Sequence, residues 1–99
     1  MADIPISQLK LELTAAENRR AELKQEFFGV HAALREKKAA MDRLKCTHDP
    51  SSNTNKYAQS LQLEGDIAEL QQKEVMVTND IHDTMNSIML LKYRIESRQ

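Results

Sequence analysis

The chain has few glycines and prolines, a single cysteine and no long apolar run. Its 99 residues include 2 Gly, 2 Pro, 4% aromatic residues and no Trp. A single cysteine, Cys46, rules out an internal disulfide and is typical of a reducing compartment, so we expect a soluble cytoplasmic protein. The longest apolar run, Ile88 to Leu91, is far too short to span a membrane. The net charge of -1 predicts no general attraction to nucleic acid.

Strong helix formers dominate what remains. Ala, Leu, Glu, Lys, Gln and Arg are abundant, and 29% of the residues are charged. Hydrophobic residues make up 40% of the chain and are regularly spaced, which is not typical of a disordered protein. The composition therefore predicts an all-α fold with long, solvated helices.

Turn-forming residues cluster at one internal place, from Thr47 to Asn55, and include Pro50. We therefore predict one helix at about 5–48, a turn at about 49–54 and a second helix at about 55–97, together forming a single helical hairpin. The alternative is one uninterrupted helix that runs through Pro50 and forms a parallel dimer. The density of turn formers argues against it.

Apolar residues recur along both helices at spacings that alternate between three and four residues. We call these positions the seam. The seam of the first helix is Ile6, Leu9, Leu13, Ala16, Arg20, Leu23, Phe27, Val30, Leu34, Lys37, Met41 and Leu44. The seam of the second helix is Leu63, Ile67, Leu70, Glu74, Val77, Ile81, Thr84, Ile88, Leu91 and Ile95. This period is that of a coiled coil, so we predict that the two helices pair as an antiparallel coiled-coil hairpin.

Two registers of this pairing, one heptad apart, are compatible with the seam. One places Leu34 opposite Leu70, with the chain folding back inside the Pro/Ser/Asn cluster. The other places Leu34 opposite Leu63 and gives better flanking charge pairs. Exposed ion pairs contribute about 0.2–1 kcal/mol each, whereas a buried leucine contributes about 1.5–3 kcal/mol. Turn chemistry and layer quality therefore favour the Leu34–Leu70 register.

Four seam positions are polar: Arg20, Lys37, Glu74 and Thr84. Polar residues in a coiled-coil core fix register and limit promiscuous association, and this is the role we predict for them. A buried charged site built from Arg20 and Glu74 is the alternative interpretation.

Catalytic and metal-binding patterns are not supported. Cys46, His48 and Asp49 lie close together at the turn, but no second Cys/His pair completes a zinc site. His31 and His82 have no histidine partner four residues away and are interpreted as surface residues. We predict no enzyme activity, no cofactor and no small-molecule substrate.

Apolar residues in excess of the seam predict a protein-interaction surface. Met85, Met89, Leu90 and Tyr93 make the end of the second helix apolar on most sides, and Ile4 and Leu11 belong to the same end of the hairpin. Phe28 and Met76 predict a smaller patch midway along. We expect hairpins to pair into a four-helix bundle, or a helical segment of another protein to dock there.

In architecture, the predicted hairpin resembles two kinds of small helical chaperone, prefoldin subunits and tubulin-binding cofactor A. It departs from both. The turn has no room for the β-hairpins of prefoldin, and the second helix has no break that would produce the third helix of cofactor A. We therefore expect a coiled-coil scaffold protein, a structural subunit of a cytoskeletal, ciliary or trafficking assembly. The alternative is a small helical chaperone or adaptor that binds a client protein.

Overall fold

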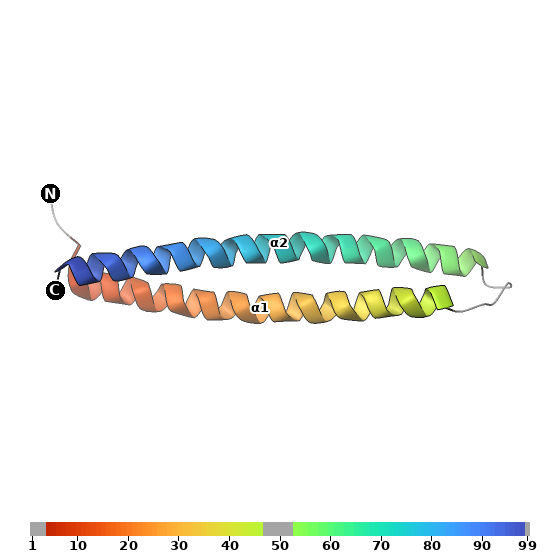
Figure 1. The fold of residues 1–99 in the computed structure, drawn as a ribbon, viewed down its shortest axis with the longest axis horizontal. Helices are drawn as coiled ribbons and strands as arrows, with labels where there is room; N and C mark the ends of the chain where they lie inside the picture. Colours follow the sequence, from red (N-terminus) through yellow and green to blue (C-terminus); the bar gives the residue numbers. More distant parts are fainter. Residues whose placement is uncertain (1–3, 47–52, 99) are drawn as a thin grey trace. The chain divides into compact units, whose positions relative to one another are not determined.

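The fold is all-α, as predicted. The computed structural model describes residues 4–46 and 53–98. Helix α1 spans Ile6–Cys46, with 41 residues, and helix α2 spans Asn53–Arg98, with 46 residues. The two helices contact each other as a helical hairpin (Figure 1). Within the described ranges, neither helix combines the length and hydrophobicity that a membrane span requires.

The helix ends lie within a few residues of the predicted ones. Helix α1 begins directly after Pro5, whose carbonyl oxygen accepts hydrogen bonds from the backbone N–H groups of Gln8 at 3.0 Å and Leu9 at 3.1 Å. Proline is tolerated there because the first turn needs no N–H from it. Helix α2 begins at Asn53, two residues earlier than predicted. Most of the predicted turn, including Pro50, lies outside the described residues, as does the predicted end of the first helix at about 48.

Contacts divide the chain into two units. Unit 1 comprises Met1–Glu26 and Val77–Gln99, and unit 2 comprises Phe27–Met76. Each unit contains one segment of α1 and one segment of α2. Since the first segment of α1 belongs with the last segment of α2, the helices are antiparallel.

The seam is where the chain is buried. Every predicted seam position, from Ile6 to Leu44 and from Leu63 to Ile95, is buried or half-buried. The buried core of unit 1 is Leu9, Leu23, Val77, Ile88 and Ile95. The buried core of unit 2 is Val30, Leu34 and Met41. Lys56 and Ser60 continue the same spacing and are half-buried, so the seam of α2 begins earlier than its apolar residues indicate.

One contact across unit 2 selects the Leu34–Leu70 register. The Lys37 Nζ atom lies 3.1 Å from Asp66 Oδ2. In the Leu34–Leu70 register, Asp66 is one residue from the level of Lys37. In the rival register it would be displaced by six residues, about 9 Å along the helix. An ion pair of 3.1 Å is incompatible with that displacement.

Burial along the seam supplies most of the stability, because fully buried leucines each contribute about 1.5–3 kcal/mol. We predict that Leu23→Ala lowers the free energy of unfolding by about 2–5 kcal/mol, since Leu23 is only 1% exposed. Leu11→Ala is the matched control on the same helix, because Leu11 is 72% exposed. It should change the free energy of unfolding by less than about 0.5 kcal/mol. Urea denaturation followed by circular dichroism measures both, and equal losses would contradict the assigned core.

Candidate protein-interaction surfaces

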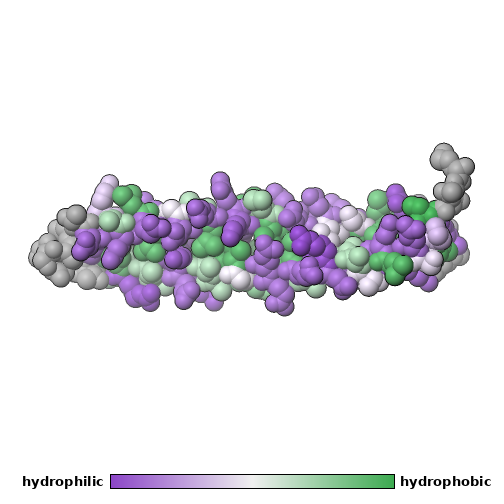
Figure 2. Space-filling view, turned by 180° about the vertical axis from the view of Figure 1, so that it is seen from behind, coloured by the Kyte–Doolittle hydropathy of each residue, from purple (hydrophilic) through white to green (hydrophobic). Residues whose placement is uncertain are grey.

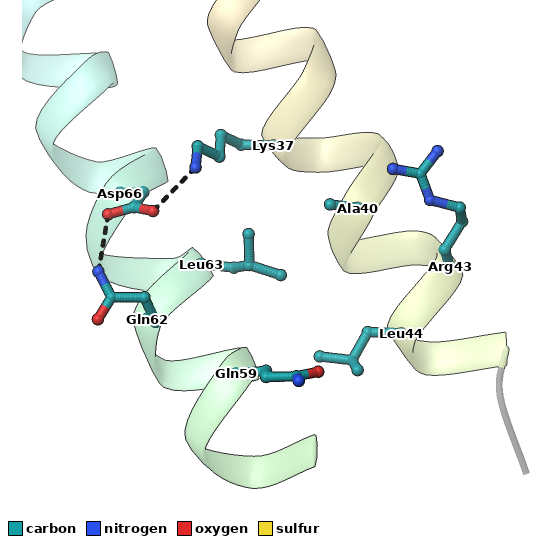
Figure 3. Close-up of a pocket in the computed structure, with 8 residues that line it drawn as sticks. All are labelled: Lys37, Ala40, Arg43, Leu44, Gln59, Gln62, Leu63 and Asp66. Atoms are coloured by element: carbon teal, nitrogen blue, oxygen red, sulfur yellow. Dashed lines mark hydrogen bonds and ion pairs between the residues drawn. The ribbon is translucent and has the colours of Figure 1, made fainter. Parts of the chain in front are cut away.

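Lys37, a predicted polar seam residue, forms an ion pair with α2. Its ammonium group lies 3.1 Å from Asp66, and the side-chain amide of Gln62 donates a hydrogen bond of 3.1 Å to the other oxygen of the same carboxylate (Figure 3). The long lysine side chain thus keeps its charge at the edge of the seam. This arrangement ties one face of α1 to one level of α2.

Glu74, the second polar seam residue of unit 2, also meets α1. Its carboxylate lies 3.1 Å from Nε2 of His31, and the His31 ring lies 4.5 Å from the ring of Phe27. The contact is an ion pair when the imidazole is protonated. The interpretation of His31 as a simple surface residue is therefore incomplete. Pairing the two helices in the Leu34–Leu70 register could have indicated this contact.

The other two polar seam residues lie in unit 1. Arg20 is half-buried, as is Thr84. The Thr84 hydroxyl donates a hydrogen bond of 2.8 Å to the backbone carbonyl of Asp80, one turn earlier in the same helix. Thr84 therefore satisfies its polar group locally. The register-setting role of all four polar seam residues remains a prediction.

A shallow groove lies between the helices of unit 2, around the Lys37–Asp66 pair (Figure 3). Its lining is Lys37, Ala40, Arg43, Leu44, Gln59, Gln62, Leu63 and Asp66. Leu63 and Leu44 form its floor as half-buried seam residues. The charges of Lys37 and Asp66 already pair with each other. The groove is thus a lightly packed part of the seam, and Lys37 and Asp66 pair across it.

The predicted interaction residues of unit 1 are exposed. Leu11 is the most exposed of them, Met89 is 66% exposed and Tyr93 is 69% exposed. Among the described residues of this unit, the exposed large hydrophobic side chains are Ile4, Leu11, Met85, Met89, Leu90 and Tyr93. Figure 2 shows hydrophobic surface on the visible face at the end of the chain that carries the termini. On α2, Met85, Met89 and Tyr93 follow each other at four-residue spacing and therefore adjoin on the helix surface.

Unit 2 carries a second group of exposed apolar side chains. Phe28 and Met76, both predicted, are 66% and 65% exposed. Val75 is exposed beside Met76, and the Phe28 ring contacts its neighbour Phe27 with centroids 6.2 Å apart. Tyr57 and Leu61 are also exposed and were not predicted as interaction residues. Tyr57, Leu61 and Val75 each follow a seam position of α2 by one residue. This shared spacing is the signal that could have identified Tyr57 and Leu61.

Of the three neighbouring polar residues Cys46, His48 and Asp49, the structure describes only Cys46. Cys46 is an exposed free thiol at the end of α1, while His48 and Asp49 lie outside the described residues. Within residues 4–46 and 53–98, no group of three or more His, Cys, Asp or Glu side chains is placed to hold a metal ion.

Comparisons with protein families, curated proteins and solved structures found no match to this chain.

Lys37→Leu tests the predicted role of the polar seam. The Lys37–Asp66 pair is partly exposed, at 43% and 27%, so its loss should cost no more than about 1 kcal/mol. A leucine would extend the apolar seam, and we expect a net gain of about 1 kcal/mol in the free energy of unfolding. We also expect a broader distribution of assembly masses in sedimentation, because a specificity-setting polar group is lost. Lys38→Leu is the control, because Lys38 is the next residue along α1 and is exposed. A single unchanged mass with Lys37→Leu would remove the register-setting role.

Proposed function

We propose that this chain is a non-enzymatic helical interaction element. An apolar surface of α2 is exposed in the hairpin and binds a helical partner. The observation that carries this proposal is the contiguous exposure of Met85, Met89, Leu90 and Tyr93 on one end of α2. Scattered apolar side chains are common on protein surfaces, but adjoining ones mark interaction sites.

The kind of partner follows from the shape of this surface. Met85, Met89 and Tyr93 form a ridge along α2, and Leu90 adjoins it one turn before Tyr93. A ridge of this kind packs into the grooves of another helix. A coiled-coil partner, either another copy or a different protein, fits it best. A structural subunit of a cytoskeletal, ciliary or trafficking assembly would need such a surface. The exposed thiol of Cys46 supports a reducing, cytoplasmic location.

A chaperone or adaptor role is the second candidate. Met76, Met85 and Met89 are three of the chain's 5 methionines, and all three are exposed. Methionine side chains are flexible and polarizable, so they adapt to clients of different shape. A client-binding hairpin would hold its partners transiently, whereas a structural subunit would hold one partner in fixed stoichiometry.

Met85→Glu/Met89→Glu tests the proposed function. Two carboxylates on the apolar ridge cannot be buried against a helical partner without a large desolvation cost. We expect the native size of the tagged full chain in an extract of its own cells to fall to that of the free chain. Helicity in circular dichroism should be unchanged, because both side chains are exposed. Size-exclusion chromatography of the extract measures the result.

Ser87→Glu/Arg94→Gln is the matched control. It changes the net charge by the same amount, and both residues are exposed on α2 away from the ridge. The control should keep the native size of the parent chain. If the ridge variant also keeps that size, or if the parent chain is already free in the extract, the proposed function is wrong.

A further inference from the structure

A second groove lies between the helices of unit 2, at the end where α1 ends and α2 begins. Its lining is Leu44, Lys45, Lys56, Tyr57 and Ser60, and all five residues belong to unit 2. We call it the lysine groove. It shares only Leu44 with the groove around the Lys37–Asp66 pair. Two ammonium groups, one from each helix, therefore line one shallow site.

Lys56 differs from the other lysine of the seam. Lys37 lies 3.1 Å from the carboxylate of Asp66, which balances its charge. Lys56 is half-buried at a seam position, and Lys45 lies on the facing helix. Within residues 4–46 and 53–98, no carboxylate lies within ion-pair distance of Lys56 or Lys45. Because a partly desolvated ammonium is stabilised by a nearby anion, this groove favours an anionic ligand.

The charges around the groove are also mostly positive. Residues that directly follow a seam position lie on the same side of each helix as Lys45 and Tyr57. From Arg35 to Glu64, the charged residues at these positions, together with Lys56, are Arg35, Lys38, Asp42, Lys45, Lys56 and Glu64. Four of them are basic and two are acidic. The next carboxylate along α2 on this side, that of Glu74, lies against His31.

An apolar pair adjoins the two lysines. Tyr57 is 69% exposed and Leu61 is 51% exposed. They are four residues apart on α2, so their side chains are neighbours on the helix surface. The hydroxyl of Ser60 already contacts the sulfur of Met41, at 3.7 Å. The groove thus offers two cations and an apolar patch to the same ligand.

We propose that the lysine groove binds an acidic polypeptide segment. Carboxylates of the segment pair with Lys45 and Lys56, and an apolar side chain of the segment packs on Tyr57 and Leu61. This surface belongs to unit 2, whereas the Met85–Tyr93 ridge of the proposed function belongs to unit 1. The two proposals therefore concern different surfaces and can fail independently.

The chemistry of the groove favours a polypeptide over a phosphate-bearing ligand. Single-stranded nucleic acid binds to rows of aromatic side chains, and Tyr57 is the one aromatic residue in the lining. The whole chain has a net charge of -1, which gives no general attraction to a polyanion. A free phosphate has no apolar part to pack on Tyr57 and Leu61. A segment with both carboxylates and an apolar side chain uses every part of the site.

Titration of the full chain with the capped hexapeptide Glu-Glu-Leu-Glu-Glu-Leu tests the site. Amide chemical shifts, measured by NMR at low ionic strength, report which residues the peptide contacts. We expect saturable changes at millimolar peptide that are largest around Lys45, Lys56 and Tyr57. Ala40 and Asp66, which line the other groove, should change much less. Salt should weaken binding, because the charges that pair are partly exposed.

Charge-neutral variants test whether the two lysines carry the binding. In Lys45→Gln/Lys56→Gln we expect the peptide dissociation constant to rise roughly five- to ten-fold, since two charge pairs are lost. Lys45→Arg/Lys56→Arg retains both charges and should stay within about two-fold of the parent chain. Lys10→Gln/Lys24→Gln is the matched control, because it removes two exposed lysines that follow seam positions of unit 1. This control should also stay within about two-fold. Circular dichroism should show the same helicity in all variants.

Several results would overturn the proposal. An absence of shift changes at millimolar peptide would remove the site, and an equal loss of affinity in the Lys10/Lys24 control would reduce it to unspecific attraction. Displacement of the peptide by a lower concentration of inorganic phosphate or hexauridylate would assign the groove to a phosphate-bearing ligand. Asp49 lies outside the described residues. If Asp49→Asn tightens peptide binding about ten-fold, the chain's own carboxylate is the occupant.

Discussion

Burial of one apolar seam on each helix is the constraint on which the rest of this structure depends. The chain has 2 Gly and 2 Pro in its 99 residues, so it forms long helices, and a long helix is stable only if it buries a face. The alternation of three and four residues keeps that face continuous, and every position that follows it is buried or half-buried. Leu9 and Leu23 are each 1% exposed and are the most completely buried residues of the seam.

A narrow seam leaves most of each helix surface outside it, and the two helices use that surface differently. Beside its seam, α1 carries lysines and other polar groups, which favour solvent. In the same position, α2 carries Tyr57, Leu61, Val75, Met85 and Met89. These side chains are exposed in the single chain, so their burial requires another molecule. This difference between the two helices is the physical basis of the proposed interaction role.

Much of the fold could be predicted from spacing alone, because the seam and its polar members, Lys37 and Glu74 among them, follow directly from the period. The register could not be decided with equal force, since layers one heptad apart are chemically alike; the Lys37–Asp66 contact selects one. The apolar pattern does not predict that the α2 seam begins at Lys56, because Lys56 and Ser60 are polar. The sequence predicted only some of the exposed apolar residues, because Tyr57 lies far from the apolar C-terminal end of α2. The partner leaves no distinctive mark, since many coiled coils obey the same heptad rules.

The most direct measurement of the central claim is disulfide closure across the seam of unit 2. In a Cys46→Ser chain, Leu34→Cys/Leu70→Cys joins two positions of one layer, whereas Leu34→Cys/Leu63→Cys joins the layer of the rival register. Because a disulfide forms only when the two Cα atoms lie within about 7 Å, we expect the first pair to close within one chain and the second to stay reduced. Peptide mapping of the monomer by mass spectrometry reports both. Closure of the second pair in preference to the first would contradict the account.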